Sequence, residues 1–571
     1  MRRARLTENR SPARREGPPT PVTTPDERPA AHRLRRPRDP VHLAVAILLI
    51  ALTGGAVALL IAIASTLLVA PPRPARTAVT ALDPGCRMDE LVSLDSWTLA
   101  RLERPPVSVP KKRSWEHALG PGRQPQAALR ERLAGWPAVL VVNPATLPRQ
   151  PRAFAERLAR DTWRGLEALT DRDHGLPLDT IALAAGGKGP PKAARIGDYT
   201  NVTNMGLHLA AIVGALELGL VERAGALARV KRLLATLGEL ETDDGFFFNY
   251  YDTTTLERTS HFVSFVDSAW LTAGLMLARM TFPELYEHCS ALIAQTDYGV
   301  LYDPVAGLMS HGYYIEPRAP SRYHYGVLYT EARLGTLIAI GKGDVPERAW
   351  FNMARTFPPE CRWQSRPPVE VRTIEVRGYA LTAGHYRWGG LRYVPSWGGS
   401  MFEALMPTIL LDEFAAAPRS LGRNGLAHAV GQRRFARRHL GLPVWGLSPS
   451  ATPHSDGYGE YGARPLGSLG YAPGPVTPHA AALAVAAIPS AALHNLQRMA
   501  ARYPIYGDYG FYDAVDPETG QVAYKYLALD QSMLFLALVN YLTDHALQRR
   551  FGADPIIQRA LPIIAAEDFL H

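Results

Sequence analysis

Cysteine is scarce in this chain of 571 residues, which has only Cys86, Cys289 and Cys361, far apart in the sequence. Such spacing excludes a disulfide framework and a cysteine-based metal cluster, although an oxidising compartment would allow one bridge. The chain also lacks histidine pairs at metal-binding spacing, phosphate-binding glycine loops and the glycine-flanked serine of serine hydrolases. We therefore predict no metal site and no cofactor.

An excess of positive charge is lacking in most of the chain, although the formal net charge is +9. Residues 1–40 hold eleven arginines against five acidic residues, which gives +6 and leaves +3 for the other 531 residues. Binding to nucleic acid needs clustered Lys and Arg on the folded body. We therefore expect no nucleic-acid partner.

The N-terminal residues predict a membrane anchor. Residues 1–40, rich in Arg, Pro, Ser and Thr, are predicted to be a disordered cytoplasmic tail. Residues 41–70 contain no Asp, Glu, Lys or Arg, and this stretch exceeds the roughly 20 residues needed to cross a bilayer. We predict one transmembrane helix there, in an inner or plasma membrane. Because basic residues stay on the cytoplasmic side, the rest of the chain should be periplasmic or extracellular.

The remaining sequence divides into a Pro- and Arg-rich stalk (71–150), a large helical domain (151–550) and a C-terminal extension (551–571). Apolar residues at helical spacing predict about twelve helices in the large domain, at 152–170, 204–220, 222–239, 263–280, 283–296, 326–341, 345–356, 400–416, 425–440, 477–487, 489–503 and 528–546. Alternation within 369–394 predicts an inserted β-hairpin. Twelve helices in six hairpins would form an all-α (α/α)6 barrel, a toroid whose loops at one end can form a carbohydrate cleft.

Two loops mix aromatic and acidic side chains, at 243–252 and 506–513. Aromatic rings stack on sugar faces, while carboxylates bond hydroxyl groups and transfer protons. The alternative is that these loops are tightly packed, hydrogen-bonded connections. Several such loops together favour a carbohydrate cleft.

Six motifs extend this prediction: YTNVTNMGL at 199–207, GFFFNYYD at 245–252, VDSAWLTAGL at 266–275, YTEARL at 329–334 with GDVP at 343–346, SWGGSMFE at 396–403 and YGFYD at 509–513. With these motifs the chain resembles, over about 150–550, the glucoamylase-like proteins that include endo-β-1,2-glucanases and the C-terminal domain of cyclic β-1,2-glucan synthases. The resemblance implies an (α/α)6 barrel and glycoside chemistry by paired carboxylates.

The resemblance directs attention to Glu331 as general acid and Glu403 as its partner, with Asp267 as the main competitor. Alternatively, Glu331 forms an ion pair with Arg333, and Glu403 is a helix-end charge. The sequence leaves retention and inversion of the sugar configuration both open. The predicted substrate-binding residues are Asn204, Phe248, Tyr250, Asp252, Trp270, Tyr329, Arg333, Trp397, Trp445, Tyr509, Phe511 and Asp513.

One loop departs from the family pattern. Relatives have Trp-Gly-Ile-Ser-Glu where this chain has WGLSP at 445–449, so an acidic residue is missing. Asp456 or Glu460 would restore the charge from a shifted loop.

The sequence thus predicts a membrane-anchored glycoside hydrolase or transglycosylase acting on a β-glucan, with β-1,2-glucan favoured. A non-catalytic polysaccharide-binding or envelope-assembly protein is the alternative. A polysaccharide lyase is a third reading, but no residues single out its base.

Overall fold

The computed structural model describes residues 126–183, 194–316, 318–321, 323–455 and 457–569, all within one compact unit, Leu82–His571. In these ranges no helix combines the length and apolar character needed to span a membrane. The predicted tail, the predicted transmembrane helix at 41–70 and residues 71–125 of the predicted stalk lie outside them.

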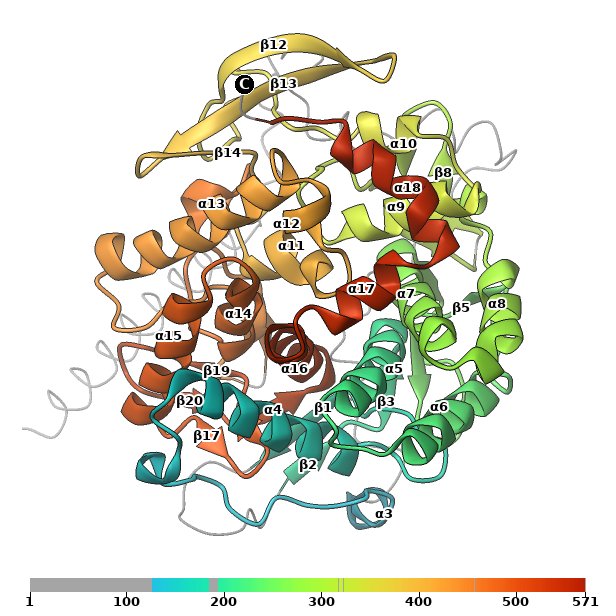
Figure 1. Ribbon diagram of the computed structural model, residues 1–571, viewed down its shortest axis with the longest axis vertical. Helices are drawn as coiled ribbons and strands as arrows, with labels where there is room; N and C mark the ends of the chain where they lie inside the picture. Colours follow the sequence, from blue (N-terminus) through green and yellow to red (C-terminus); the bar gives the residue numbers. More distant parts are fainter. Residues whose placement is uncertain (1–125, 184–193, 317, 322, 456, 570–571) are drawn as a thin grey trace, which may run out of the picture. The chain divides into compact units, whose positions relative to one another are not determined.

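Six helices in the described ranges form an inner ring (Figure 1): α5 (Val202–Glu217), α7 (Phe265–Thr281), α9 (Ala332–Lys342), α11 (Met401–Leu405), α14 (Pro478–Leu483) and α16 (Ala528–Leu542). Around the ring, α16 contacts α5, α5 contacts α7, α7 contacts α9, and α11 contacts α14, which contacts α16. Arg333 of α9 closes the ring by donating to the carbonyls of Glu403 and Ala404 on α11. These helices are apolar on almost every side, as expected of buried helices.

Outer helices pack against this ring: α4 (Pro151–Ala168), α6 (Arg223–Leu237), α8 (Tyr286–Gln295), α10 (Arg348–Phe351), α13 (Leu421–Arg434) and α15 (Pro489–Arg502). Helix α4 shows why they form, since Phe154, Leu158 and Leu166 recur at helical spacing on its buried face while Arg160 and Arg164 are exposed. The predicted α/α toroid is confirmed.

Two helices are shorter than predicted, for one shared reason. The carbonyl of Gly326 accepts from the backbone N–H of Ala354, and the carbonyl of Ala354 accepts from that of Leu328. This pairing delays the start of α9 to Ala332 and ends α10 at Phe351. The predicted helix 400–416 is also divided, into α11, a 3-10 turn at Met406–Ile409 that contains Pro407, and α12 (Glu413–Ala416), because proline cannot continue the helical hydrogen-bond ladder.

The described ends of the body pack onto the toroid. Helix α3 (Gln126–Glu131) and the residues after it, at the end of the predicted stalk, bury Leu129, Leu133 and Leu140. At the other end, the predicted extension forms α17 (Ala546–Gly552) and α18 (Pro555–Ala565), and α18 packs on α9. A buried ion pair of 2.7 Å joins Asp554, the N-cap of α18, to Arg279 of α7.

The inserted hairpin is confirmed. Strands β12 (Val369–Val376), β13 (Tyr379–Trp388) and β14 (Leu391–Tyr393) form an antiparallel sheet at the edge of the body (Figure 1). Val376 pairs with Tyr379 across a two-residue turn, in which Arg377 and Gly378 both have positive φ angles, 52° and 84°. That conformation matches the twist of a hairpin.

Short strands fix the loops before three inner helices. They are β3 (Tyr199–Asn201) paired with β6 (Tyr250–Asp252) before α5, β7 (Phe262–Ser264) paired with β10 (Gly312–Tyr314) before α7, and β21 (Lys525–Leu527) paired with β1 (Thr180–Leu183) before α16. Strand β1 also pairs with β2 (Ala194–Ile196), and β10 with β11 (Ala319–Pro320). In five further antiparallel pairs each strand is two residues long: β4 (Thr242–Asp243) with β5 (Phe246–Phe247), β8 (Tyr302–Asp303) with β9 (Leu308–Met309), β15 (Ser450–Ala451) with β16 (Tyr458–Gly459), β17 (Tyr506–Gly507) with β18 (Gly510–Phe511) and β19 (Ala514–Val515) with β20 (Val522–Ala523).

Candidate active site

Polar side chains gather where the inner helices begin. The first turn or N-cap of each inner helix carries one of them: Asn204, Asp267, Glu331, Glu403, His479 and Asp530. The starts of neighbouring helices meet, because the Thr203 hydroxyl of α5 donates to Asp267 of α7 over 2.6 Å. Helix N-termini favour carboxylates through their backbone dipoles. The acid-bearing ends of the inner helices therefore define one face of the toroid.

Glu331 occupies the N-cap position of α9, and its side chain makes no capping hydrogen bond. It is half-buried. Burial raises the pKa of its carboxyl to about 7, and the nearby charges of Glu403 and Asp267 act in the same direction. A carboxylic acid that keeps its proton near neutral pH is suited to general acid catalysis.

Glu403 has a structural task at the start of α11. Its carboxylate accepts from the Ser396 hydroxyl at 2.8 Å and from the backbone N–H groups of Gly398 at 2.9 Å and Ser400 at 3.2 Å, the last as part of a capping box with the Ser400 side chain. Burial raises the pKa of the carboxyl, and these donors oppose the rise. The helix-end alternative therefore describes Glu403 well, since both of its oxygens already have donors.

Asp267 is more open than Glu403. It is half-buried in the first turn of α7, and its Oδ1 accepts from Thr203. Burial raises its pKa. The charge of Asp267 also raises the pKa of Glu331, so the two carboxyl groups lie within electrostatic reach of each other.

Asp179, which the sequence did not single out, joins this group from the loop before β1. Asn204 donates to its Oδ1 at 2.9 Å, and Thr180 donates to its Oδ2 at 2.9 Å. Burial raises its pKa. Asn204 is thus placed at the acid-bearing end, as a buried side chain that positions Asp179.

Half-buried aromatic rings accompany these acids: Tyr250, Tyr325, Trp397, Tyr458 and Tyr471. Burial raises the pKa of the four tyrosine hydroxyls, with further contributions from the carboxylates beside them. For Tyr325 those carboxylates are Glu331 and Asp267, and for Tyr471 they include Glu403 and Glu460. Rings that are partly accessible and adjoin carboxylates can stack on sugars.

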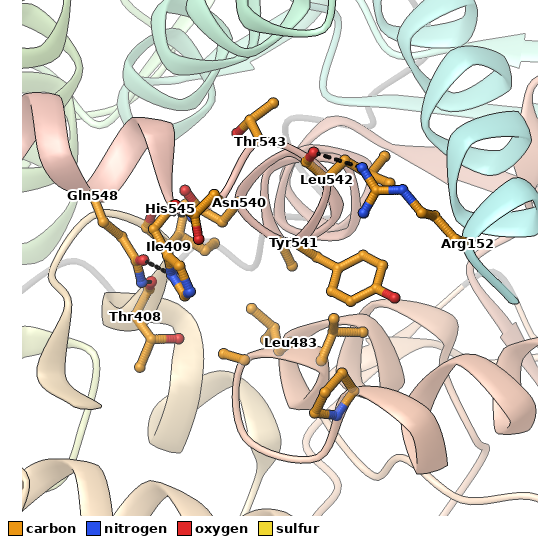
Figure 2. Close-up of a pocket in the computed structure, with 15 residues that line it drawn as sticks. Arg152, Thr408, Ile409, Leu483, Asn540, Tyr541, Leu542, Thr543, His545 and Gln548 are labelled. Carbon is orange, nitrogen blue, oxygen red and sulfur yellow. Dashed lines mark hydrogen bonds between the residues drawn. The ribbon is translucent and has the colours of Figure 1, made fainter. Parts of the chain in front are cut away.

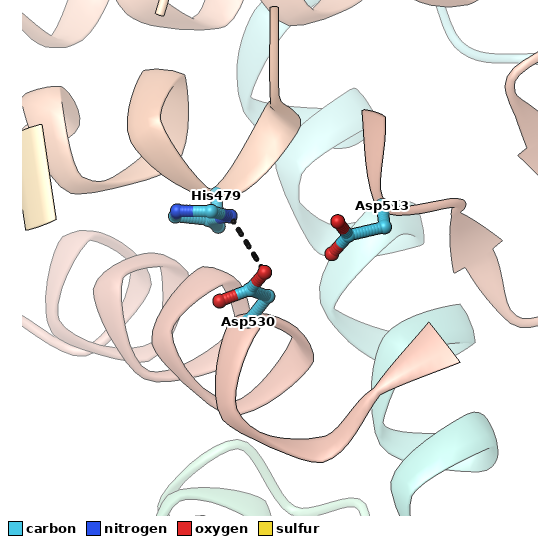
Figure 3. Close-up of side chains that lie close together, drawn as sticks. All are labelled: His479, Asp513 and Asp530. Atoms are coloured by element: carbon cyan, nitrogen blue, oxygen red, sulfur yellow. Dashed lines mark ion pairs between the residues drawn. The ribbon is translucent and has the colours of Figure 1, made fainter. Parts of the chain in front are cut away.

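His479, Asp513 and Asp530 converge at the starts of α14 and α16 (Figure 3), where one donor atom from each lies within 4.8 Å of the others. All three are buried, and both Asp530 oxygens lack a hydrogen-bond donor among the described residues. Such a group could hold a metal ion, but its hydrogen bonds do not suit one. The Thr477 hydroxyl donates to the Asp513 carbonyl over 2.7 Å and must therefore accept from His479 Nδ1, which lies 2.8 Å away.

His479 Nδ1 therefore carries a proton where a metal would need a lone pair, and this atom is also the one 3.4 Å from Asp530. The hydrogen bonding thus favours an acid pair over a metal centre. Burial raises the pKa of Asp513 and of Asp530, and the charge of Asp513 raises that of Asp530 further. Burial and the charge of Asp513 thus both favour the protonated form of Asp530.

Several residues predicted to bind substrate are instead buried in the core, where no ring face is open to a sugar: Phe248, Trp270, Tyr329, Trp445, Tyr509 and Phe511. Their partners are protein groups. The Arg258 guanidinium lies 4.6 Å from the centre of the Phe248 ring, and the Tyr329 hydroxyl donates to the Leu421 carbonyl. The aromatic side chains at these positions therefore pack in the core of the protein.

Two predicted polar contacts are also internal. Arg333 is fully buried and pairs with Glu413 at 2.7 Å, not with Glu331. Asp252 accepts from the backbone N–H groups of Thr254 and Thr255, which closes a turn. Each of these side chains has its hydrogen-bonding capacity directed into the protein.

The loop at 445–449, which lacks the expected acid, is hydrogen-bonded to the start of α11. Ser448 is buried, and its hydroxyl accepts from the backbone N–H of Phe402 at 3.0 Å. Of the two replacements considered, Asp456 lies outside the described residues and Glu460 is exposed. Glu460 does raise the pKa of Tyr471, so its charge is felt at the acid-bearing end.

A pocket of about 370 Å³ lies away from the acid-bearing end of the toroid (Figure 2). Its lining includes Thr408 and Ile409 after α11, Leu483 at the end of α14, and Asn540 near the end of α16. These are the C-terminal ends of inner helices, so the pocket lies at the opposite end of the toroid from Glu331. Its lining contains none of the carboxylates described above.

Comparison with known proteins agrees with this fold. Residues 370–555 match the glycoamylase family model, described as "Putative glucoamylase". The chain is 31% identical over 293 residues to the cyclic β-(1,2)-glucan synthase NdvB of Rhizobium meliloti, an alignment that covers 48% of this chain but 9% of that protein. The chain therefore spans about a tenth of the length of this relative.

Solved structures share the toroid. An endo-β-1,2-glucanase from Chitinophaga pinensis aligns with a TM-score of 0.56 at 16% identity, over 73% of this chain and 99% of that one. A β-1,2-glucanase from Parabacteroides distasonis aligns with a TM-score of 0.58 at 16% identity, over 74% and 61%. These matches confirm the resemblance to glucoamylase-like proteins.

Proposed function

We propose that this protein is a glycoside hydrolase, or a transglycosylase of the same chemistry, that acts on β-1,2-glucan with Glu331 as general acid. The observation that carries the proposal is the half-buried Glu331 carboxyl, whose pKa is raised to about 7 beside other acids and partly accessible aromatic rings. The names of the similar proteins, a cyclic β-(1,2)-glucan synthase and β-1,2-glucanases, support the substrate.

We assign the second carboxylate to Asp267 in preference to Glu403. Glycoside cleavage needs one acid to protonate the leaving oxygen and one carboxylate to activate water or attack the sugar. The carboxylate of Glu403 is buried and engaged by backbone and serine donors, whereas Asp267 is half-buried and therefore more accessible to a substrate. Tyr250, Tyr325, Trp397, Tyr458 and Tyr471 would hold the sugar rings.

We also propose that residues 41–70 anchor the enzyme in the membrane with its catalytic body outside the cytoplasm. The uncharged stretch and the arginine-rich tail before it support this orientation. Cys361 is disulfide-bonded, and disulfides persist in oxidising compartments outside the cytoplasm.

The test is incubation of the purified protein with linear β-1,2-, β-1,3- and β-1,4-glucans, followed by analysis of released oligosaccharides. We expect cleavage of β-1,2-glucan, with loss of product for Glu331→Gln and for Asp267→Asn. The missing acid at 445–449 favours a second candidate, a non-catalytic glucan-binding protein. Glucan binding without product, unchanged in both variants, would establish that candidate and reject the hydrolase.

A further inference from the structure

A basic pocket on the outer surface is not explained by the proposed function. It has a volume of about 460 Å³ and is lined by Arg433, Arg437, His494 and Arg498, together with Trp445, Ser490, Ala491 and Asn495. Arg433 belongs to α13, Arg437 to the π-helical turn Phe435–His439 that continues it, and His494 and Arg498 to α15. The pocket therefore lies between two outer helices.

The pocket is positively charged without compensation from the described residues. All four basic side chains are exposed, and no Asp or Glu is among the lining residues. Here three guanidinium groups face one hollow, which concentrates positive potential and attracts an anion.

Two of the arginines are held in place from the same loop. Arg437 donates through Nη1 to the Leu442 carbonyl at 2.7 Å, and Arg498 donates through Nη1 to the Pro443 carbonyl at 3.4 Å. Gly441, with a φ angle of 70°, provides the turn that brings this loop back after the π-helical turn. A guanidinium has five N–H donors, so each arginine keeps others for a ligand.

His494 and the π-helical turn add to this arrangement. His494 Nδ1 donates to the carbonyl of Ser490 at 2.7 Å, which holds the ring at the edge of the pocket. π-helical turns are rare and occur frequently at functional sites. Pre-positioned donors bind an anion with a smaller entropic cost than mobile side chains do.

We propose that this basic pocket binds a phosphate group, carried by an anionic lipid headgroup or by a soluble phosphate compound. Phosphate fits because its oxygens accept paired hydrogen bonds from planar guanidinium groups. Three arginines also balance the charge of a phosphate better than that of a single carboxylate. The proposal is independent of glucan cleavage, since none of the lining residues belongs to the acid-bearing end of the toroid.

The experiment is calorimetric titration of the full-length protein in a non-ionic detergent with two probes, inorganic phosphate and dihexanoyl phosphatidylglycerol. Arg433→Gln combined with Arg498→Gln tests the pocket. Arg423→Gln is the matched control, because Arg423 is an exposed arginine of the same α13 helix outside the pocket. Thermal melting of each variant verifies folding.

We expect wild type and the control to bind with equal affinity and the double variant to bind at least about tenfold more weakly, which corresponds to about 1.4 kcal/mol. Binding should also weaken as salt is added. Binding of both probes would identify the phosphate group itself as the ligand, and binding of the lipid alone would identify a headgroup. Absence of binding by both probes, or equal affinity in a folded double variant, would overturn the proposal.

Discussion

Replacing Glu331 by Gln should separate activity from stability. Gln imitates the protonated acid but cannot release a proton, so we expect glucan cleavage to fall by about 10²- to 10⁴-fold, the usual contribution of a general acid. Stability should change in the opposite direction. The native pKa of about 7 lies above the ordinary value of 4.5, so the native state binds the proton more tightly than the unfolded state does.

The sign follows from proton linkage. The contribution of the Glu331 carboxyl to stability is fully present below about pH 4.5 and is lost as the pH rises through 7, because the native site then has to hold a charged carboxylate. A difference of about 2.5 pKa units corresponds to up to about 3 kcal/mol. Glu331→Gln should therefore be more stable than wild type at pH 8 and equally stable at pH 4.

Thermal unfolding at both pH values, together with oligosaccharide release at pH 6, measures the two effects. Glu239→Gln is the control, since Glu239 is exposed and should change neither quantity. A Glu331→Gln variant that keeps wild-type activity, or that is no more stable than wild type at pH 8, would refute the assignment of half-buried Glu331 as a general acid with a raised pKa.

Three further substitutions test the roles assigned to individual residues. Glu403→Ala should destabilise the protein by about 1 kcal/mol or more through loss of the α11 cap, as measured by thermal unfolding; unchanged stability would return Glu403 to the catalytic candidates. Arg333→Met should cost about 3–5 kcal/mol, because it leaves Glu413 buried and unpaired, and a melting temperature equal to wild type would contradict that ion pair. Trp397→Ala should raise KM for glucan about tenfold with a smaller change in kcat, if the half-buried ring stacks on a sugar; an unchanged KM would exclude it from the binding surface.

Helical periodicity predicted the toroid well because its inner helices are apolar on nearly all sides and its outer helices are amphipathic. The paired strands before α5, α7 and α16 were missed, because strands of three or four residues carry no clear alternation. Pairing between the backbone of Gly326 and Ala354 shortened two predicted helices, and such contacts between separate segments leave no local pattern.

The candidate site was predicted in part. Motifs directed attention to Glu331 and Asp267, whose catalytic roles stay a prediction, but they could not separate buried aromatics such as Trp270 from partly accessible ones such as Trp397. Tyr325 and Tyr471 were missed, although both lie in loops that lead into inner helices. Once those helices are known to start at one end, aromatic residues in the preceding loops become the signal to follow.

Two buried ion pairs join parts of the chain that are far apart in sequence. Arg279 of α7 pairs with Asp554, 275 residues later in the chain, and Arg355 pairs with Glu567, 212 residues later. Both arginines are buried, so in the folded body each depends on its distant carboxylate partner. Because leaving a buried charge unpaired costs about 3–5 kcal/mol, these two pairs make the stability of the body depend on contacts between parts of the chain that are far apart in sequence.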